Sequence, residues 1–245
     1  MNFFRSKKKA PAYSGFSWLK QDIHSHILPG IDDGSPDIET SIQLLRSLSD
    51  AGINKFICTP HVIGDMYHNN PQTINDALSR LKKAVSQNGM AVEINAAAEY
   101  MMDDHFMELL RRKEPLLTLT KNYILTELSY STAPQKLEQI SFEIHINNYQ
   151  PLMAHPERYP YYHKNYNAYY RMKELGFLLQ VNLLSLTGYY GKTVAKAAKF
   201  ILDNKLADFV GTDLHHFNHL QVLTDMKSIK IFEKYLGDKM YNEFG

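Results

Sequence analysis

The sequence predicts an α/β fold built on a mostly parallel sheet. Short apolar runs rich in β-branched residues end in polar residues and alternate with amphipathic segments of helical length over most of the 245 residues. Strands that alternate with helices indicate parallel pairing, and seven such units favour a closed barrel over an open sheet. The alternation alone also permits a doubly wound open sheet.

Seven segments have the composition of buried strands. In chain order they are residues 17–23, 55–58, 92–97, 123–128, 150–153, 178–181 and 208–210. Helical patterns fill most of the gaps, at residues 38–51, 75–87, 134–147, 167–175 and 194–204. The first helix is the clearest, because Ile42, Leu45 and Leu48 share one face and Gly52 follows as a stop.

Composition narrows the functional class. A hydrophobic fraction of 44% with 22% charged residues is ordinary for a soluble globular protein with a core. The net charge of +1 gives no sign of a nucleic-acid binder. The single cysteine, Cys58, excludes an internal disulfide framework, and no apolar run reaches the roughly 18–20 residues of a membrane span. We therefore expect a cytoplasmic protein.

The chain is expected to form one domain with a short tail. Residues 1–16 contain three consecutive lysines but no apolar stretch of the kind that a secretory signal requires. We expect them to form a basic, disordered tail that binds membranes weakly at most. No repeat or long linker divides the rest, so residues 17–245 are predicted to form a single domain.

Candidate metal ligands occur at or just past the carboxyl ends of six of the seven predicted strands, and one more lies in the first loop. They are His24, His26, Asp33, His61, Glu99, Glu127, His155, Asp213 and His215. In parallel α/β folds this edge is where active sites assemble. So many imidazoles and carboxylates on one rim exceed what packing explains, and metal ions would satisfy them.

The spacing of these residues also suits metal chemistry. His24 and His26 are two residues apart, so in an extended segment both side chains point the same way and can hold one ion. A carboxylate can bridge two ions, which makes Glu99 or Asp213 the natural bridging ligand. A nitrogen and oxygen ligand set without thiolate favours manganese, iron or zinc.

Several motifs in a fixed order carry a resemblance to a known family. They are His24-x-His26 with Asp33, Thr59-Pro60-His61, Ala98-Glu99-Tyr100, Glu127, Ala154-His155-Pro156-Glu157-Arg158-Tyr159 and Asp213-x-His215. A lone His-x-His would be weak evidence, whereas the complete ordered set is specific and covers nearly the whole chain. The sequence resembles the PHP-domain (polymerase and histidinol phosphatase) protein-tyrosine phosphatases of bacterial capsule and exopolysaccharide loci, which are metal-dependent.

That resemblance implies a distorted (β/α)7 TIM-like barrel of the PHP type that binds three divalent metal ions, usually described as Mn²⁺. The family pattern divides the ligands among three ions: His24, His26, Glu99 and Asp213; Glu99, Glu127 and His155; and Asp33, His61 and His215. Glu99 would therefore bridge the first and second ions.

The resemblance also implies catalytic roles for Arg158, Glu99 and Asp213. Arg158 would bind phosphate, although by itself it could simply pair with Glu157 or a neighbouring carboxylate. Family members often carry a further arginine a few residues past the final Asp-x-His. Here that stretch reads DLHHFNHL, which leaves open whether His216 or His219 takes its place.

The implied activity is hydrolysis of phosphotyrosine by a metal-activated hydroxide. The metals and Arg158 would stabilise charge on the phosphoryl oxygens. A phenolate leaving group, with a pKa near ~10, needs less protonation than a serine alkoxide. The expected partner is a phosphotyrosine protein, the cytoplasmic tail of a membrane-associated bacterial tyrosine kinase that controls polysaccharide export.

Two alternatives remain open on the sequence. The chain could be a PHP phosphatase for a small phosphomonoester such as histidinol phosphate, although the AHPERY motif and the short loops favour phosphotyrosine. It could also be a degenerate metal-binding scaffold without turnover, which the complete ligand set argues against. A cysteine-based phosphatase is not expected, because Cys58 is followed by TPHVIGD and not by a basic phosphate-binding loop.

Overall fold

The computed structural model describes residues 15–16, 18–237 and 241–243. Most of the predicted tail, residues 1–14, lies outside the described residues. Phe16 is fully buried against Trp18 and Phe232, so the packed core begins within the stretch that was assigned to the tail. Within the described ranges, no helix is long and apolar enough to cross a membrane.

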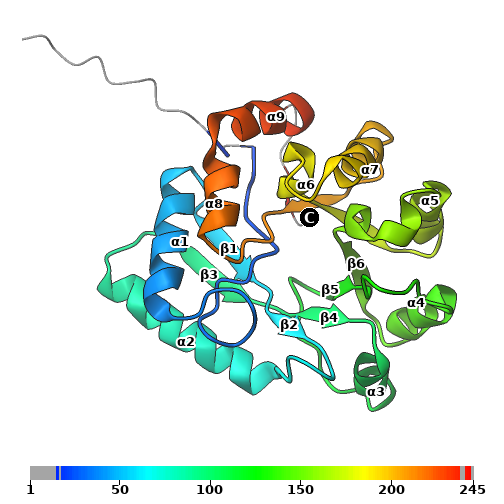
Figure 1. Cartoon of the computed structure of the whole chain (residues 1–245). Helices are drawn as coiled ribbons and strands as arrows, with labels where there is room; N and C mark the ends of the chain where they lie inside the picture. Colours follow the sequence, from blue (N-terminus) through cyan, green and yellow to red (C-terminus); the bar gives the residue numbers. More distant parts are fainter. Residues whose placement is uncertain (1–14, 17, 238–240, 244–245) are drawn as a thin grey trace, which may run out of the picture.

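Parallel strands form the centre of the molecule (Figure 1). They are β1 (Lys55–Cys58), β2 (His61–Val62), β3 (Glu93–Ala96), β4 (Glu99–Met101), β5 (Tyr123–Glu127), β6 (Gln150–Ala154), β7 (Leu178–Asn182) and β8 (Phe209–Gly211). Strand β1 pairs with β3, and the others follow the order β2-β4-β5-β6-β7-β8. Each of these pairings is parallel, which confirms the predicted α/β class.

Helices connect the strands and lie around them (Figure 1). They are α1 (Ile38–Asp50), α2 (Pro71–Gln87), α3 (Asp104–Arg111), α4 (Leu137–Ile146), η1 (Pro156–Arg158), η2 (Pro160–Tyr162), α5 (Asn167–Glu174), α6 (Leu183–Thr187), α7 (Lys192–Asp203), α8 (Phe217–Thr224) and α9 (Met226–Leu236). Helix α1 ends before Gly52, which has a φ of 108°, as predicted. Helix α2 begins at Pro71, earlier than expected, because Asn70 and Thr73 form a capping box there.

The two sheets continue into each other across short gaps. Backbone hydrogen bonds of 2.9 Å from Ala97 to Cys58 and 3.0 Å from Glu99 to Pro60 bridge the gap between the β1–β3 and β2–β4 pairs. Pro60 has no N–H to donate, so the regular ladder is interrupted there. The register beyond the gap pairs His61 with Glu99, which brings two predicted ligands side by side.

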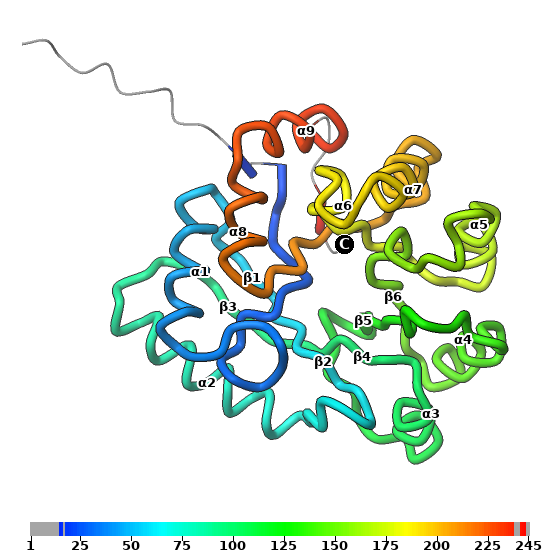
Figure 2. The backbone as a smooth tube through the Cα atoms, in the orientation of Figure 1, coloured from blue at the N-terminus to red at the C-terminus, as the bar shows by residue number. Residues whose placement is uncertain are grey.

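The first predicted strand, residues 17–23, does not form a regular strand where the chain is described. Isolated parallel bridges replace it: Leu19 with Tyr241, Asp22 with Phe56, and Ser25 with Leu214. The segment changes neighbours along its length, so no continuous ladder can develop. Backbone hydrogen bonds still join it to β1 on one side and to the stretch after β8 on the other. Figure 2 shows this return, with the blue start of the chain beside the orange stretch.

Two apolar cores lie on the two faces of this curved sheet. The large one packs the sheet against the surrounding helices. The small one contains residues of β1, β5, β6 and β8 and of the segments beside the strands: Ile23, Ile57, Ala97, Leu119, Leu125, Leu152, Ala154 and Phe209. An inner core lined by many strands holds their carboxyl ends at fixed distances from one another, which is what a multi-strand site needs.

Candidate metal centre

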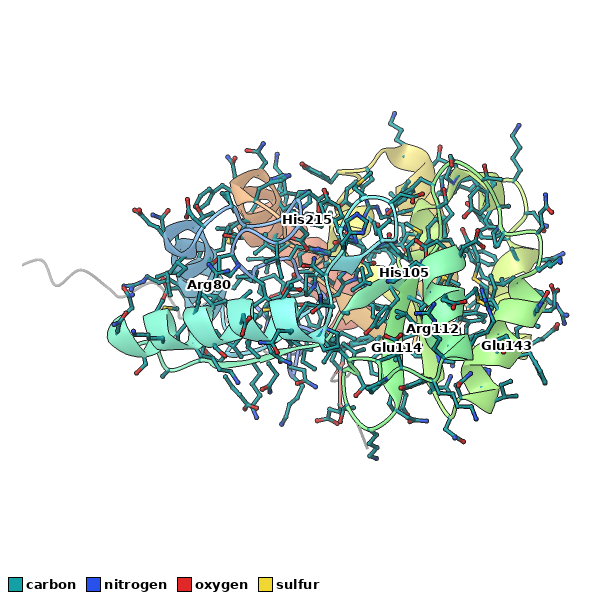
Figure 3. All side chains as sticks on the ribbon, turned by 90° about the horizontal axis from the view of Figure 1, so that it is seen from below. Arg80, His105, Arg112, Glu114, Glu143 and His215 are labelled. Carbon is teal, nitrogen blue, oxygen red and sulfur yellow. The ribbon has the colours of Figure 1, made fainter. Side chains whose placement is uncertain are left out.

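The nine expected ligands lie in one cluster near the carboxyl ends of the strands. In the side view of Figure 3, the label of His215 shows that the cluster lies in the upper half of the molecule. Glu114, at the other end of the strands, lies in the lower half. Most of the nine side chains are fully buried. His61 and His215 are partly buried, and Asp33, on the loop after the first segment, is the most open, with 53% of its side chain exposed.

Glu99 occupies the middle of the cluster. Its Oε2 atom is 3.3 Å from Nε2 of His24 and 3.1 Å from Nδ1 of His61. Its Oε1 atom is 3.1 Å from Nε2 of His155. Burial alone would raise the pKa of this carboxyl, but the imidazoles of His24 and His61 outweigh it and lower the pKa well below its usual range. Glu99 is therefore an ionised carboxylate that contacts ligands on both of its oxygens.

His24 and His26 point the same way, as their spacing predicts. Their Nε2 atoms are 3.3 Å apart, and each lies 3.4 Å from Oδ1 of Asp213. Two imidazole nitrogens and a carboxylate oxygen thus converge on one point. Burial would raise the pKa of Asp213, but His24 and His215 lower it well below the ordinary value.

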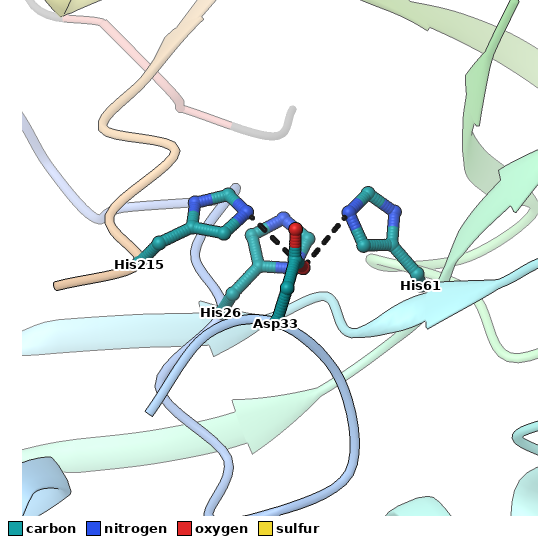
Figure 4. Close-up of side chains that lie close together, drawn as sticks. All are labelled: His26, Asp33, His61 and His215. Atoms are coloured by element: carbon teal, nitrogen blue, oxygen red, sulfur yellow. Dashed lines mark ion pairs between the residues drawn. The ribbon is translucent and has the colours of Figure 1, made fainter. Parts of the chain in front are cut away.

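A second, more open group lies at the mouth of the cluster (Figure 4). It consists of His26, Asp33, His61 and His215, whose ligand atoms lie within 4.8 Å of one another. Oδ1 of Asp33 is 3.5 Å from Nε2 of His61 and 3.6 Å from Nε2 of His215. The ring of His26 stacks on that of His215, with centroids 3.9 Å apart. The exposed carboxylate completes this group from the solvent side.

The spatial groups differ from the expected division of the ligands. Besides the open group, they are His24, His26 and Asp213; His24, Glu99 and His155; and His61, Glu99 and Glu127. Glu127 therefore lies with His61, at 2.9 Å, and not with His155. His61 faces two groups because its ring nitrogens point in different directions. A neutral imidazole offers one lone pair, so His61 can serve only one group at a time.

Several buried atoms of the cluster lack a hydrogen bond within the described part of the chain. They are both carboxylate oxygens of Glu99, Oε1 of Glu127 and Nδ1 of His61. A buried carboxylate oxygen without a partner is costly, and a cation between facing lone pairs would stabilise all of them. Imidazole nitrogens and carboxylate oxygens are ligands of divalent transition metals. The residues of this cluster therefore fit bound metal ions.

The protonation states of two of the five imidazoles suit metal binding directly, whereas neighbouring carboxylates raise the pKa of His24, His26 and His61. Burial, reinforced by Arg158, lowers the pKa of His155 to about 4. Burial and the neighbouring His26 lower the pKa of His215 to about 3. Both imidazoles are therefore neutral at pH 7, which is the form that binds a metal.

Two ligands have backbones in the left-handed region. His155 has a φ of 34° and Asp213 a φ of 51°. Such conformations cost about 1–3 kcal/mol for residues other than glycine and concentrate at functional sites. His155 directly follows β6, and Asp213 lies two residues after the end of β8, so both conformations occur where a strand ends at the cluster.

Arg158 lies at the edge of the cluster. Its Nη1 atom donates a 2.6 Å hydrogen bond to Oδ2 of Asp213. Its guanidinium carbon is 5.1 Å from the ring centre of Tyr130 and 4.2 Å from that of Tyr190. The expected alternative holds in part: Arg158 pairs with a neighbouring carboxylate, that of Asp213, but not with Glu157, which accepts hydrogen bonds from the beginning of α6. Arg158 is thus held between two rings beside the ligands, and among the described residues only its Nη1 atom has a hydrogen-bond partner.

The sequence reasoning missed the polar residues that orient the ligands. They are Asp32, which contacts Nδ1 of His26 at 2.8 Å; Gln180, which contacts Nδ1 of His24 at 2.7 Å; and Asn182, which donates to Oδ2 of Asp213 at 2.6 Å. Such partners fix the orientation of metal-binding side chains. A signal was available in β7, the strand that supplies no ligand, where Gln180 and Asn182 interrupt an apolar run.

His216 and His219 occupy different positions. His216 is the N-cap of α8, and its Nδ1 atom accepts a 3.4 Å hydrogen bond from the backbone N–H of His219. His219 is buried, with Nδ1 3.2 Å from the carbonyl oxygen of Asp213 and its ring 5.5 Å from that of His215. His219, and not His216, packs against the cluster.

Comparison with known proteins gives matches over almost the whole chain. The family model for capsular polysaccharide synthesis, CpsB/CapC, matches residues 20–244. The tyrosine-protein phosphatase YwqE of Bacillus subtilis is 28% identical over 219 residues, which cover 89% of this chain and 86% of the relative. The putative tyrosine-protein phosphatase CapC of Staphylococcus aureus is 26% identical over 225 residues, covering 90% and 88%.

Solved structures agree with these matches. The crystal structures of YwqE from Bacillus subtilis and CpsB from Streptococcus pneumoniae are described as metal-dependent tyrosine phosphatases. This chain matches a chain from that work with a TM-score of 0.78 and 28% sequence identity, and the match covers 89% of this chain and 87% of the solved chain. A histidinol phosphate phosphatase from Lactococcus lactis has a TM-score of 0.54 and 13% identity, covering 92% and 95%, which is a likeness of fold alone. The chain belongs to the CpsB/CapC family of capsular polysaccharide synthesis.

Proposed function

We propose that this protein is a metal-dependent protein-tyrosine phosphatase. The observation that carries the proposal is the cluster of imidazoles and carboxylates around Glu99, with Arg158 at its edge. Metal-binding residues beside an arginine with uncommitted donors form a site for a phosphoryl group. The relatives YwqE and CpsB are named tyrosine-protein phosphatases, which supports the same substrate class here.

The metal content that we propose is about three divalent ions, because nine ligands exceed what one or two ions normally use. Mn²⁺ is the first candidate, and iron or zinc would also suit the donor set. Glu99 is proposed as the carboxylate shared between ions, because both of its oxygens face ligand nitrogens. His61 is the ligand whose assignment to one group or the other depends on which of its nitrogens binds.

The chain's own residues would bind and orient the substrate. When bound, the divalent ions supply a water of lowered pKa and stabilise negative charge on phosphoryl oxygens. Arg158 donates charge-assisted hydrogen bonds to the phosphoryl group, and Asp213 holds its guanidinium in position. The rings of Tyr130 and Tyr190 restrict the guanidinium further, so little freedom is lost when phosphate binds.

The proposed substrate is phosphotyrosine on a protein, with the cytoplasmic tail of a membrane-associated bacterial tyrosine kinase as the partner. Membership in a family of capsular polysaccharide synthesis supports a role in regulating that pathway from the cytoplasm. The alternative, a phosphatase for histidinol phosphate, is supported by likeness of fold alone. A scaffold without turnover is disfavoured because all nine expected ligand residues belong to groups that could hold a metal ion.

One experiment tests this proposal. Protein stripped with a strong chelator is assayed before and after addition of Mn²⁺, against a phosphotyrosine peptide, the matching phosphoserine peptide and histidinol phosphate. We expect activity only with metal, and at least about tenfold higher kcat/KM for phosphotyrosine than for the other two. Full activity without metal would contradict metal dependence, and a preference for histidinol phosphate would contradict the substrate class.

A further inference from the structure

Tyr130 stands between the metal ligands and the phosphate-binding arginine. It lies in the loop between β5 and α4, three residues after Glu127. Its hydroxyl is 3.3 Å from Nδ1 of His155, and its ring stacks on that imidazole with centroids 5.9 Å apart at 24°. The same ring faces the guanidinium of Arg158. With 38% of the residue exposed, Tyr130 is also open to a substrate.

The contact with His155 fixes the direction of the hydrogen bond. Nε2 of His155 faces Glu99 inside the ligand cluster, so this is the nitrogen that offers its lone pair to a metal. A neutral imidazole that binds through Nε2 carries its proton on Nδ1. Nδ1–H must then donate, and the hydroxyl oxygen of Tyr130 must accept. The O–H of Tyr130 is consequently left free to donate to another group.

We propose that Tyr130 donates its free O–H to the phenolic oxygen of the leaving group when phosphotyrosine is hydrolysed. This inference rests on the proposed function. In the reaction the P–O bond to the phenol breaks and its electron pair stays on the phenolic oxygen. Water supplies both the hydroxyl that ends on phosphorus and the proton that ends on the phenol. Tyr130 keeps its own proton and stabilises the charge that develops on the leaving oxygen.

Neighbouring groups support this role. Arg158 would be occupied with the phosphoryl oxygens and Asp213, and the hydroxyl of Tyr190 is buried. Tyr130, in contrast, is partly exposed, and its hydroxyl can donate a hydrogen bond to the leaving group. A tyrosine hydroxyl is ordinarily protonated at neutral pH and can therefore donate.

The test compares leaving groups in the Tyr130→Phe variant, which keeps the ring and removes the hydroxyl. The substrates are a phosphotyrosine peptide and para-nitrophenyl phosphate, whose leaving group is a weaker base and needs less stabilisation. We expect kcat for the peptide to fall on the order of a hundredfold, and kcat for para-nitrophenyl phosphate to fall less than about fivefold. Equal losses for both substrates, or no loss for either, would overturn the proposal.

Binding measurements on the same variant separate this role from a structural one. Metal content and the Kd for inorganic phosphate should stay within about twofold of the wild type, because neither involves the leaving oxygen. Loss of metal from Tyr130→Phe would instead assign the hydroxyl to positioning His155 and overturn the proposal. Tyr130→Leu also removes the ring that restricts Arg158, so it should add a weaker Kd for inorganic phosphate to the selective loss.

A matched control is Tyr189→Phe, which removes the hydroxyl of another exposed tyrosine. It should change neither substrate's kcat by more than about twofold. If wild-type protein hydrolyses neither substrate, the proposed function fails. If the wild type is active but the Tyr130→Phe losses are equal, only the leaving-group role fails.

Discussion

Replacing Glu99 with glutamine should weaken two metal sites at once. The change is nearly isosteric, so the buried side chain keeps its volume while its charge is removed. Glu99 belongs to two of the four ligand groups, through His24 and His155 on one side and His61 and Glu127 on the other. A single substitution therefore affects both, because an amide bridges ions poorly.

The size of the effect follows from the contacts. Loss of a residue that only hydrogen-bonds to a metal ligand lowers metal affinity about 10–100-fold. Loss of a carboxylate that binds the ions directly should therefore lower the affinity at least about a hundredfold for each ion. A hundredfold change corresponds to about 2.7 kcal/mol of metal-linked stabilisation per ion. For a chain of 245 residues this lowers the Tm of the metal-saturated protein by roughly 5–11 °C per ion.

The assay measures metal content after dialysis together with Tm at matched free metal concentrations. Glu93→Gln is the control, because this exposed carboxylate pairs with Lys55 away from the cluster and its loss should change neither quantity. If Glu99→Gln retains the full complement of ions and the wild-type Tm, Glu99 is not a shared ligand. Loss of one ion alone would limit it to a single site.

Two further substitutions address catalysis. Arg158→Ala should lower kcat/KM for a phosphotyrosine peptide on the order of a hundredfold while metal content is retained, whereas Arg171→Ala, an exposed arginine paired with Glu138, should leave both unchanged. Wild-type kinetics in Arg158→Ala would refute phosphate binding by this residue. Cys58→Ala should retain most activity and lose about 1 kcal/mol of stability, because Cys58 is fully buried and burial raises the pKa of its thiol to about 12. A folded, metal-loaded Cys58→Ala protein without activity would contradict the metal route.

Local sequence information was sufficient to predict the types of ligand residue and most of the strands. Residues such as Glu127 and His155 sit at the ends of apolar runs, and the ends of parallel strands meet at one edge whatever the details of packing. The class of fold and the gathering of the nine side chains could therefore be predicted. The first segment was misjudged because its bridges depend on three different neighbours, Tyr241, Phe56 and Leu214, that no local pattern reveals.

Which ligands contact each other within the cluster could be seen only in the tertiary structure. Glu127 contacts His61 across β4, although β6, the strand before His155, is the direct neighbour of β5, so the direction of the side chain and not strand adjacency decides this contact. The contact between His24 and Gln180 joins residues 156 positions apart. The sequence alone determined which residues can bind metal, since ligand chemistry belongs to the side chain. Only the tertiary structure decided which atoms face each other, because orientation and hydrogen-bond partners depend on contacts between segments that are distant in the chain.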